Sequence, residues 1–263
     1  MNNLEFINGL KFFQKGKFHQ AIDAFMKSIE KNPNNADSYN HIGLSYDCLS
    51  EHSLAIENYE KATNICIEFN DLNSAGKMKV HKADSMIKIS LFNEAELLID
   101  EILDSNVNLI VKAQAFSILI TSLILQGKYN EALKKLDADG LPYLVYFQDI
   151  NDNFGLGIIS MLRARLYTYI LDYDSAILSF ESARYLLKGK KSSIAELDNN
   201  YGEFLLLENN PKDALRYFKK SWKYFKKYNP SYSINVIKNL SEAYRKIGDE
   251  KKTDYWMKLL NEI

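Results

Sequence analysis

A small residue recurs along this chain at intervals of 34 to 44 residues, and a bulky residue follows each copy four positions later. The small residues are Ala21, Ala55, Ala95, Ala132, Ala176, Ala214 and, less closely, Thr253. The bulky residues are Phe25, Tyr59, Ile99, Leu136, Phe180, Phe218 and Met257. Self-similarity of this kind is typical of stacked helical repeats, in which one unit cannot bury its apolar face alone.

A second set of residues lies twelve positions before each small residue. Its members are Gly9, Gly43, Ala83, Ile120, Ala164, Gly202 and Ser241. The two sets predict two antiparallel helices per unit, here called the A helix and the B helix, with small residues where the helices approach each other. We expect the turns between them at Gly16, Ser50, Ser90, Gly127, Leu171, Asn209 and Gly248. Glycine suits such a turn because it accepts positive φ.

The composition indicates a globular protein without a charge bias toward polyanions. The 263 residues are 46% hydrophobic and 25% charged, with a formal net charge of -1. This balance does not favour nucleic acid or an anionic membrane as a partner. The run from Ala113 to Gly127 is uncharged but too short and too polar to span a bilayer. With only two cysteines, we expect no disulfide framework and a cytoplasmic location.

The pattern resembles the tetratricopeptide repeat (TPR) over nearly the whole chain. The first, second, fifth and sixth copies match best, whereas Ile120 and Thr253 depart from the small-residue rule. The resemblance implies an all-α, right-handed superhelical α-solenoid of about seven repeats, forming a single domain over residues 1–263. The expected repeats cover residues 2–35, 36–71, 74–108, 109–140, 152–188, 192–229 and 231–263. The longer repeats are similar to those of kinesin light chains and bacterial peptide-pheromone receptors.

An insertion at residues 138–155 separates the fourth and fifth repeats. Gly140 and Pro142 are expected to end the preceding helix early. Aromatic and aliphatic residues follow, including Tyr146 and Phe147. We consider two interpretations, a functional lid or extra short helix across the groove, and a plug that fills a wedge between repeats. Packing is the commoner role of aromatic residues in a connection.

The sequence contains no catalytic motif that we recognise, and we expect a non-enzyme without a cofactor. His41 and His81 occupy the same position in the A helices of repeats 2 and 3. Together with Asp47, Cys48 and Asp84 they could point into one cavity. Imidazole, thiolate and carboxylate groups are suitable metal ligands. The spacing matches no known metal pattern, however, so we favour polar groove residues over a metal site.

The TPR resemblance implies that the A helices line a concave groove that holds a peptide or protein segment. The residues expected there are Asn40, His41, Asp47, Lys77, His81, Asp84, Arg165, Tyr169, Asn199, Asn200, Glu203, Asn239, Glu242 and Arg245. An asparagine amide both donates and accepts, so it can pair with an extended backbone of any sequence. The alternative is that asparagine is simply abundant in this chain.

Two further surfaces lie in the last repeats. The predicted B helix of repeat 6, PKDALRYFKKSWKYFKKY, is rich in lysine and aromatic residues. A solvated lysine face is the commoner explanation, and an anionic partner is the alternative. The last helix has no polar capping helix after it, so Tyr255, Trp256, Leu259 and Leu260 are a candidate interface, for a homodimer or a partner protein. The alternative is that Lys251, Lys252, Lys258 and Glu262 mask this apolar surface.

The leading hypothesis is a non-catalytic intracellular scaffold or adaptor that binds a protein or peptide in its groove. The second is a receptor for a small signalling peptide that regulates a partner protein. The third is a regulatory subunit, or an enzyme, with a His/Asp site. Fold alone does not separate them, because repeats of this kind serve many processes.

Overall fold

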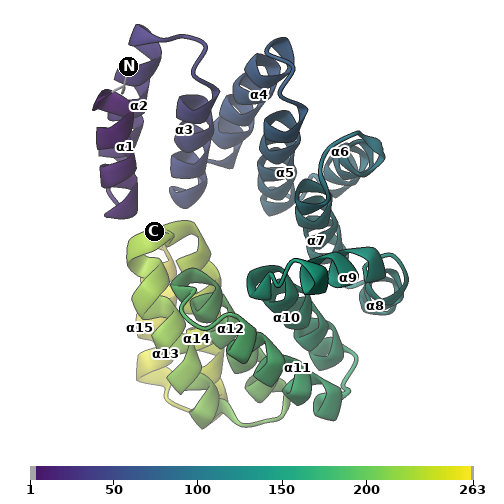
Figure 1. Cartoon of the computed structure of the whole chain (residues 1–263). Helices are drawn as coiled ribbons and strands as arrows, with labels where there is room; N and C mark the ends of the chain where they lie inside the picture. Colours follow the sequence, from purple (N-terminus) through teal and green to yellow (C-terminus); the bar gives the residue numbers. More distant parts are fainter. Residues whose placement is uncertain (1–3, 262–263) are drawn as a thin grey trace. The chain divides into compact units, whose positions relative to one another are not determined.

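The computed structural model describes residues 4–261, and within them all regular structure is α-helical. The predicted all-α class is confirmed. Fifteen helices lie in this range (Figure 1): α1 Leu4–Gln14, α2 Phe18–Lys31, α3 Ala36–Cys48, α4 His52–Glu68, α5 Leu72–Lys88, α6 Phe92–Asp104, α7 Leu109–Leu125, α8 Tyr129–Ala138, α9 Leu141–Asp149, α10 Asn153–Tyr169, α11 Tyr173–Leu186, α12 Lys191–Leu207, α13 Pro211–Tyr228, α14 Pro230–Ile247 and α15 Glu250–Asn261.

The chain divides into two compact units between Gln126 and Gly127. The N-terminal unit contains α1 to α7, and the C-terminal unit contains α8 to α15. Within each unit, consecutive helices pack against each other as hairpins, and neighbouring hairpins stack side by side (Figure 1). The division falls between α7 and α8, the two helices that the sequence assigns to one repeat. The predicted repeat bounds and the single domain stay predictions.

All seven predicted turns have a residue with positive φ, at the expected position. Three are glycine, Gly16, Gly127 and Gly248, with φ between 73° and 81°. The others are Ser50, Ser90, Leu171 and Asn209, with φ between 60° and 65°. A left-handed residue at this position ends the A helix and turns the chain directly into the B helix. The hairpin geometry is therefore built into the backbone at each turn.

The helices of a hairpin approach each other where the A helix has glycine. A Cβ atom built on Gly9 would lie 2.5 Å from the ring of Phe25, and one on Gly202 would lie 2.5 Å from the ring of Phe218. Both rings are completely buried. The glycine on one helix and the aromatic residue on the other therefore form a single packing unit, as the spacing predicts.

Six of the seven small residues of the B helices are fully buried. Ala21, Ala55, Ala95, Ala132, Ala176 and Ala214 all have 0% exposure. The seventh copy departs from the pattern, because Met257 is 45% exposed and the adjacent Trp256 is buried instead. In α15 the sequence-based expectation for Met257 is therefore wrong. Trp256 reaches the core by packing edge-to-face on Trp222, with ring centroids 5.1 Å apart.

The insertion between repeats forms a helix, α9, that begins at Leu141 with Pro142 in its first turn. Its one buried residue is Phe147, which packs on α10 where a Cβ atom on Gly155 would lie 2.5 Å from the ring. Leu141 and Val145 are exposed. The insertion thus forms the extra short helix, and its aromatic residue has a packing role.

The long uncharged run lies in α7, which is a packed helix. Val111, Ala115 and Leu119 join the buried cluster formed with α5 and α6. Among residues 4–261, no helix is both long enough and apolar enough to cross a membrane.

We expect the backbone of Leu171 to be strained in its turn. For a residue other than glycine, the left-handed conformation costs about 1–2 kcal/mol because the Cβ atom approaches the following carbonyl oxygen. Leu171 has φ of 65° and is 62% exposed, so little packing is lost on its removal. We expect Leu171→Gly to raise the free energy of unfolding by about 1 kcal/mol. Chemical denaturation measures this.

The matched control is Leu178→Gly, which removes an equally exposed leucine from the interior of α11. Glycine inside a helix should lower stability by about 1 kcal/mol. If both variants are destabilised equally, the turn at Leu171 is not strained.

Candidate functional site

The predicted groove residues belong to A helices of both units, and each unit is described by itself. In the N-terminal unit they lie on α3 and α5, and in the C-terminal unit on α10, α12 and α14. The two groups differ in one respect that bears on function. No residue of the first group has a buried side-chain polar atom without a partner, whereas Asn200 and Arg165 of the second group do.

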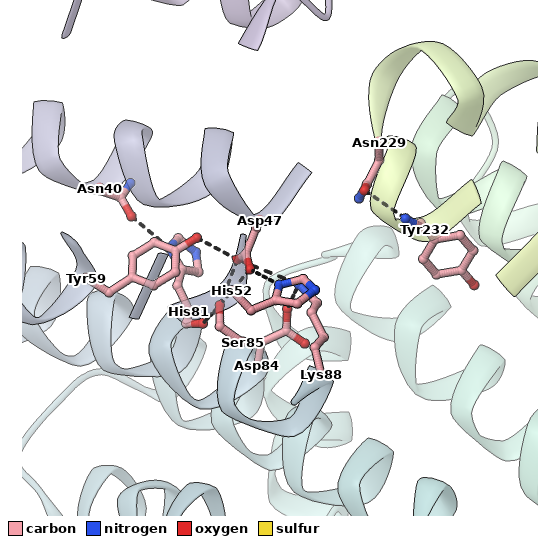
Figure 2. A network of polar contacts seen from close by, with 10 residues as sticks. All are labelled: Asn40, Asp47, His52, Tyr59, His81, Asp84, Ser85, Lys88, Asn229 and Tyr232. Atoms are coloured by element: carbon pink, nitrogen blue, oxygen red, sulfur yellow. Dashed lines mark hydrogen bonds and ion pairs between the residues drawn. The ribbon is translucent and has the colours of Figure 1, made fainter. Parts of the chain in front are cut away.

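Asp47 lies at the end of α3 and is 8% exposed. Its carboxylate accepts hydrogen bonds from the Tyr59 hydroxyl at 2.9 Å and from the Ser85 hydroxyl at 2.8 and 2.9 Å (Figure 2). His52 Nδ1 lies 2.8 Å from Oδ1, and Lys88 Nζ lies 3.6 Å from Oδ2. Four side chains from α4 and α5 therefore converge on one carboxylate and join three helices.

The charges around Asp47 stabilise its ionised form. Burial alone would raise the pKa of Asp47, but the hydrogen bond from His52 and the charge of Lys88 hold it below its usual value. Partial burial would lower the pKa of Lys88, and the carboxylates of Asp84 and Asp47 raise it instead. Lys88 also forms an ion pair with Asp84 at 2.8 Å. This cluster is a satisfied structural network.

His41 and His81 do not meet in one cavity. His41 packs against the rings of Phe6 and Phe25, with centroids 5.5 and 5.2 Å away. His81 Nδ1 lies 2.8 Å from Asn40 Oδ1, and its ring packs on Tyr59. Among residues 4–261, no group of three His, Cys, Asp or Glu side chains is arranged to hold a metal ion.

Burial also keeps these groups uncharged. It lowers the pKa of His41, and it lowers the pKa of His81 to about 4, with the charge of Lys77 acting in the same direction. Burial and the Asp47 charge raise the pKa of the Cys48 thiol to about 12. At neutral pH these residues are two neutral imidazoles and a thiol.

In the C-terminal unit, Glu203 is the centre of the polar network. Its Oε1 accepts from the amides of Asn199 and Asn239, both at 2.8 Å. Its Oε2 accepts from the Tyr169 hydroxyl at 3.0 Å. The Asn239 amide also donates to Asn199 Oδ1 at 3.0 Å. The network joins α10, α12 and α14, and it brings together four residues that the sequence places in the groove.

Two buried nitrogen atoms beside this network have no hydrogen-bond partner, Asn200 Nδ2 and Arg165 Nε. Asn200 is only 4% exposed. Arg165 interacts electrostatically with Glu196 and Glu203, which lie on either side of Asn200 on one face of α12. Arg165 is therefore influenced by the two α12 residues that flank Asn200. An unpaired buried donor is rare in proteins and requires an explanation.

The surroundings of Arg165 keep it charged. Burial would lower the pKa of Arg165, and the neighbouring Tyr169 and Glu203 raise it. Burial and Glu203 raise the pKa of Tyr169, whose ring stacks on Tyr129 at 4.7 Å. Tyr129 comes from the B helix α8, and sequence reasoning missed it because the repeat pattern assigns groove positions only to A helices.

The remaining predicted residues lie outside these networks. Glu242 and Arg245 form an exposed pair with each other at 2.8 Å on α14, and Lys77 is exposed on α5. At the C-terminal end, Tyr255 is 58% exposed, whereas Trp256 is buried. The last two predicted interface residues, Leu259 and Leu260, pack partly against the core. A homodimer through this end stays a prediction.

Two surface pockets lie away from the predicted groove positions. One, of about 200 Å³, is lined by residues of α4, α5 and α6, including Ile67, Leu72 and Ile102. The other, of about 350 Å³, is open and lies at the start of α12 beside Phe154 and Lys190.

The comparisons with known proteins agree with this fold. A family model described as TPR repeat matches residues 9–47. A Rap protein complexed with Competence and Sporulation Factor has a TM-score of 0.72 at 11% identity, covering 98% of this chain and 73% of its own. The apo form of RapI has a TM-score of 0.67 at 15% identity, and the match covers 98% of this chain and 96% of the RapI chain.

A third structure is the Rap conjugation gene regulator of the plasmid pLS20 in complex with the Phr* peptide. Its TM-score is 0.69 at 15% identity, and the match covers 98% of this chain and 74% of that one. No curated protein sequence matches the chain. At these identities the likeness shows the fold, which is that of a tetratricopeptide-repeat solenoid.

The Asp47 network should be essential to the stability of the N-terminal unit. Asp47→Ala leaves the Tyr59 and Ser85 hydroxyls without their shared acceptor and removes the partner of His52. We expect a loss of about 3–5 kcal/mol in the free energy of unfolding, as for other broken buried ion pairs. Asp84→Ala removes a half-exposed partner of Lys88 and should cost less than about 1 kcal/mol. Equal losses of stability in the two variants would contradict the role of Asp47 as the centre of the network.

The low pKa of His81 predicts a pH dependence of stability. Between pH 4 and 6.5 the unfolded chain binds a proton at His81 that the folded chain does not bind. The neutral His81 therefore contributes about 3 kcal/mol to the free energy of unfolding above pH 6.5, and this contribution is lost as the pH falls toward 4. His81→Gln should flatten this part of the stability curve. An equally steep curve in His81→Gln between pH 4 and 6.5 would contradict the assignment.

Proposed function

We propose that the protein is a non-catalytic binding scaffold and that the face of α10, α12 and α14 holds an extended segment of a protein or peptide. The observation that carries the proposal is the Asn200 amide, which is buried on this face and has a nitrogen without a partner. A buried donor of this kind is satisfied when a ligand supplies the acceptor.

A polypeptide backbone suits Asn200 because the amide group can serve both backbone partners. It offers a donor and an acceptor, the complement of the C=O and N–H of an extended chain. The terminal torsion of asparagine is broad, so the amide can turn its nitrogen toward a ligand at low cost. No described side chain holds the nitrogen in place.

Arg165 supplies the second contact. Its guanidinium carries five donors, and the buried Nε has no hydrogen-bond partner among residues 4–261. The Glu203 carboxylate accepts from Asn199, Asn239 and Tyr169, and Arg165 Nε makes no hydrogen bond to it. A backbone carbonyl of the bound segment would give Arg165 an acceptor.

The Glu203 network prepares the face for binding. Tyr169, Glu203 and Asn239 fix the relative positions of α10, α12 and α14 before a ligand arrives. A face that is already ordered loses less conformational entropy on binding. The network therefore supports the site without occupying the donors of Arg165 and Asn200.

A receptor for a small signalling peptide is the second candidate. Two of the similar structures support it, since one is a complex with Competence and Sporulation Factor and another with the Phr* peptide. As a receptor, this protein would change its affinity for a partner protein when the peptide binds. The scaffold and the receptor use the same face and differ in the length of the ligand.

The side chains that could serve catalysis are occupied in structural roles. Asp47 is saturated with hydrogen bonds, and burial keeps His81 neutral and the Cys48 thiol protonated. This supports a non-enzyme over the His/Asp alternative. Both cysteines are free and buried, which supports a reducing compartment and the proposed cytoplasmic location.

The experiment starts from the chain purified from its native cells, with bound peptides and proteins identified by mass spectrometry. The recovered segment is then synthesised and titrated calorimetrically. Asn200→Ala should weaken its binding by about tenfold, the effect of one hydrogen bond left unmade. The stability of the free variant is measured alongside, because Asn200 is buried and its truncation also removes packing.

The matched control is Asn64→Ala, which removes an exposed asparagine from α4 of the N-terminal unit and should leave the affinity unchanged. A stoichiometric protein partner supports the scaffold, and a short peptide supports the receptor. Unchanged affinity in Asn200→Ala would contradict both.

A further inference from the structure

Helix α13 carries a line of cations that the proposed site does not use. We call it the α13 basic stripe, and its members are Lys212, Arg216, Lys219, Lys220, Lys223, Lys226 and Lys227. All seven are exposed. At 100° per residue they fall within about a third of the helix circumference and extend for about 22 Å along it. The opposite face holds Ala214, Phe218 and Phe225 in the core.

Little negative charge on the helix offsets the stripe. Asp213 is the one acidic residue of α13, and it pairs with Arg216 at 3.5 Å. The other six members form no ion pair among the described residues. A row of like charges raises the local potential and attracts an anionic partner. The chain as a whole has a net charge of -1, so the stripe is a local feature.

Aromatic rings hold several of these lysines at the surface. Lys226 lies 4.1 Å from the ring centroid of Trp222, and Lys220 lies 5.0 Å from that of Tyr217. Lys219 lies 5.5 Å from that of Tyr244. Cation–π contacts restrict the side chains without neutralising them. The stripe is therefore a partly ordered row of positive charge.

We propose that the α13 basic stripe docks an acidic segment of a partner protein. The members recur at intervals of three and four residues, which is the register of one face of a helix. A partner helix with glutamate or aspartate at the same intervals would place an acid beside each cation. The stripe is one helix wide, which suits a single polypeptide segment.

Nucleic acid fits the stripe less well. Six of the seven cations are lysines, which lack the planar fork with which arginine recognises phosphate and guanine. Bases bind single-strand sites by stacking on open aromatic faces. Here Lys226 lies over the ring of Trp222, which also contacts Trp256. Lys220 and Arg184 both lie over the ring of Tyr217. These rings therefore do not offer open faces for stacking.

The test uses tryptophan fluorescence, because Trp222 contacts Lys226 of the stripe and Trp256, the other tryptophan of the chain, packs on Trp222. The probe is a synthetic helical peptide, free of tryptophan, with glutamate at every third or fourth position. Titration into the full chain should change the tryptophan fluorescence, because docking draws Lys226 away from the Trp222 ring. The affinity should fall by about tenfold or more when salt is raised from 0.05 to 0.5 M, a rough expectation for a screened contact.

The test variant is Lys219→Glu, Lys223→Glu and Lys227→Glu combined. All three residues are exposed, so circular dichroism and the melting temperature should stay close to those of the parent. Binding of the acidic peptide should be lost. The control reverses the same number of charges in the N-terminal unit, at the exposed Lys15, Lys17 and Lys27, and should retain binding.

Duplex DNA, single-stranded RNA and vesicles containing anionic lipid are titrated in parallel. Tighter binding of any of these than of the acidic peptide would overturn the proposal, and so would equal binding by the two triple variants. The proposed peptide site on α10, α12 and α14 is unaffected by either result, because the stripe residues all lie on α13.

Discussion

The structure depends on the close approach of the two helices in each hairpin. At Gly9 and Gly202 the A helix has no side chain, and the ring of a buried aromatic residue on the B helix fills the space. In six of the seven B helices an alanine with 0% exposure allows the same approach from the other side. Because the interior is close-packed, these contacts fix the rotation of each helix about its axis. That rotation decides which residues of the A helices remain available for polar contacts.

The polar residues of the A helices have two different outcomes. In the N-terminal unit, Asp47 receives hydrogen bonds or charge from four side chains, so burial of a carboxylate is compensated within the protein. In the C-terminal unit, Glu203 is equally well satisfied, yet Asn200 and Arg165 beside it are not. A fully satisfied network stabilises the fold, whereas an incomplete one calls for an external partner. This difference locates the proposed site on α10, α12 and α14.

The sequence predicts the features that repeat, because a repeated constraint leaves a repeated residue. The seven positive-φ turns, the buried alanines and the Gly–Phe contacts are all of this kind. The sequence does not predict features that depend on one side-chain conformation. His41 and His81 share a repeat position, yet one ring lies among phenylalanines and the other bonds Asn40. The unpaired state of Asn200 is likewise a property of its neighbours.

The hairpin geometry also gives the C-terminal unit two separate surfaces. The same packing that directs Asn200 and Glu203 of α12 to the A-helix face requires α13 to bury Phe218 and Phe225 against α12 and α14. The cations of α13 must then lie on the opposite side of that helix, in solvent. A ligand on the A helices and an acidic segment on α13 would therefore not compete for the same residues. Two independent surfaces are what an adaptor requires, since it must hold one partner while it engages another.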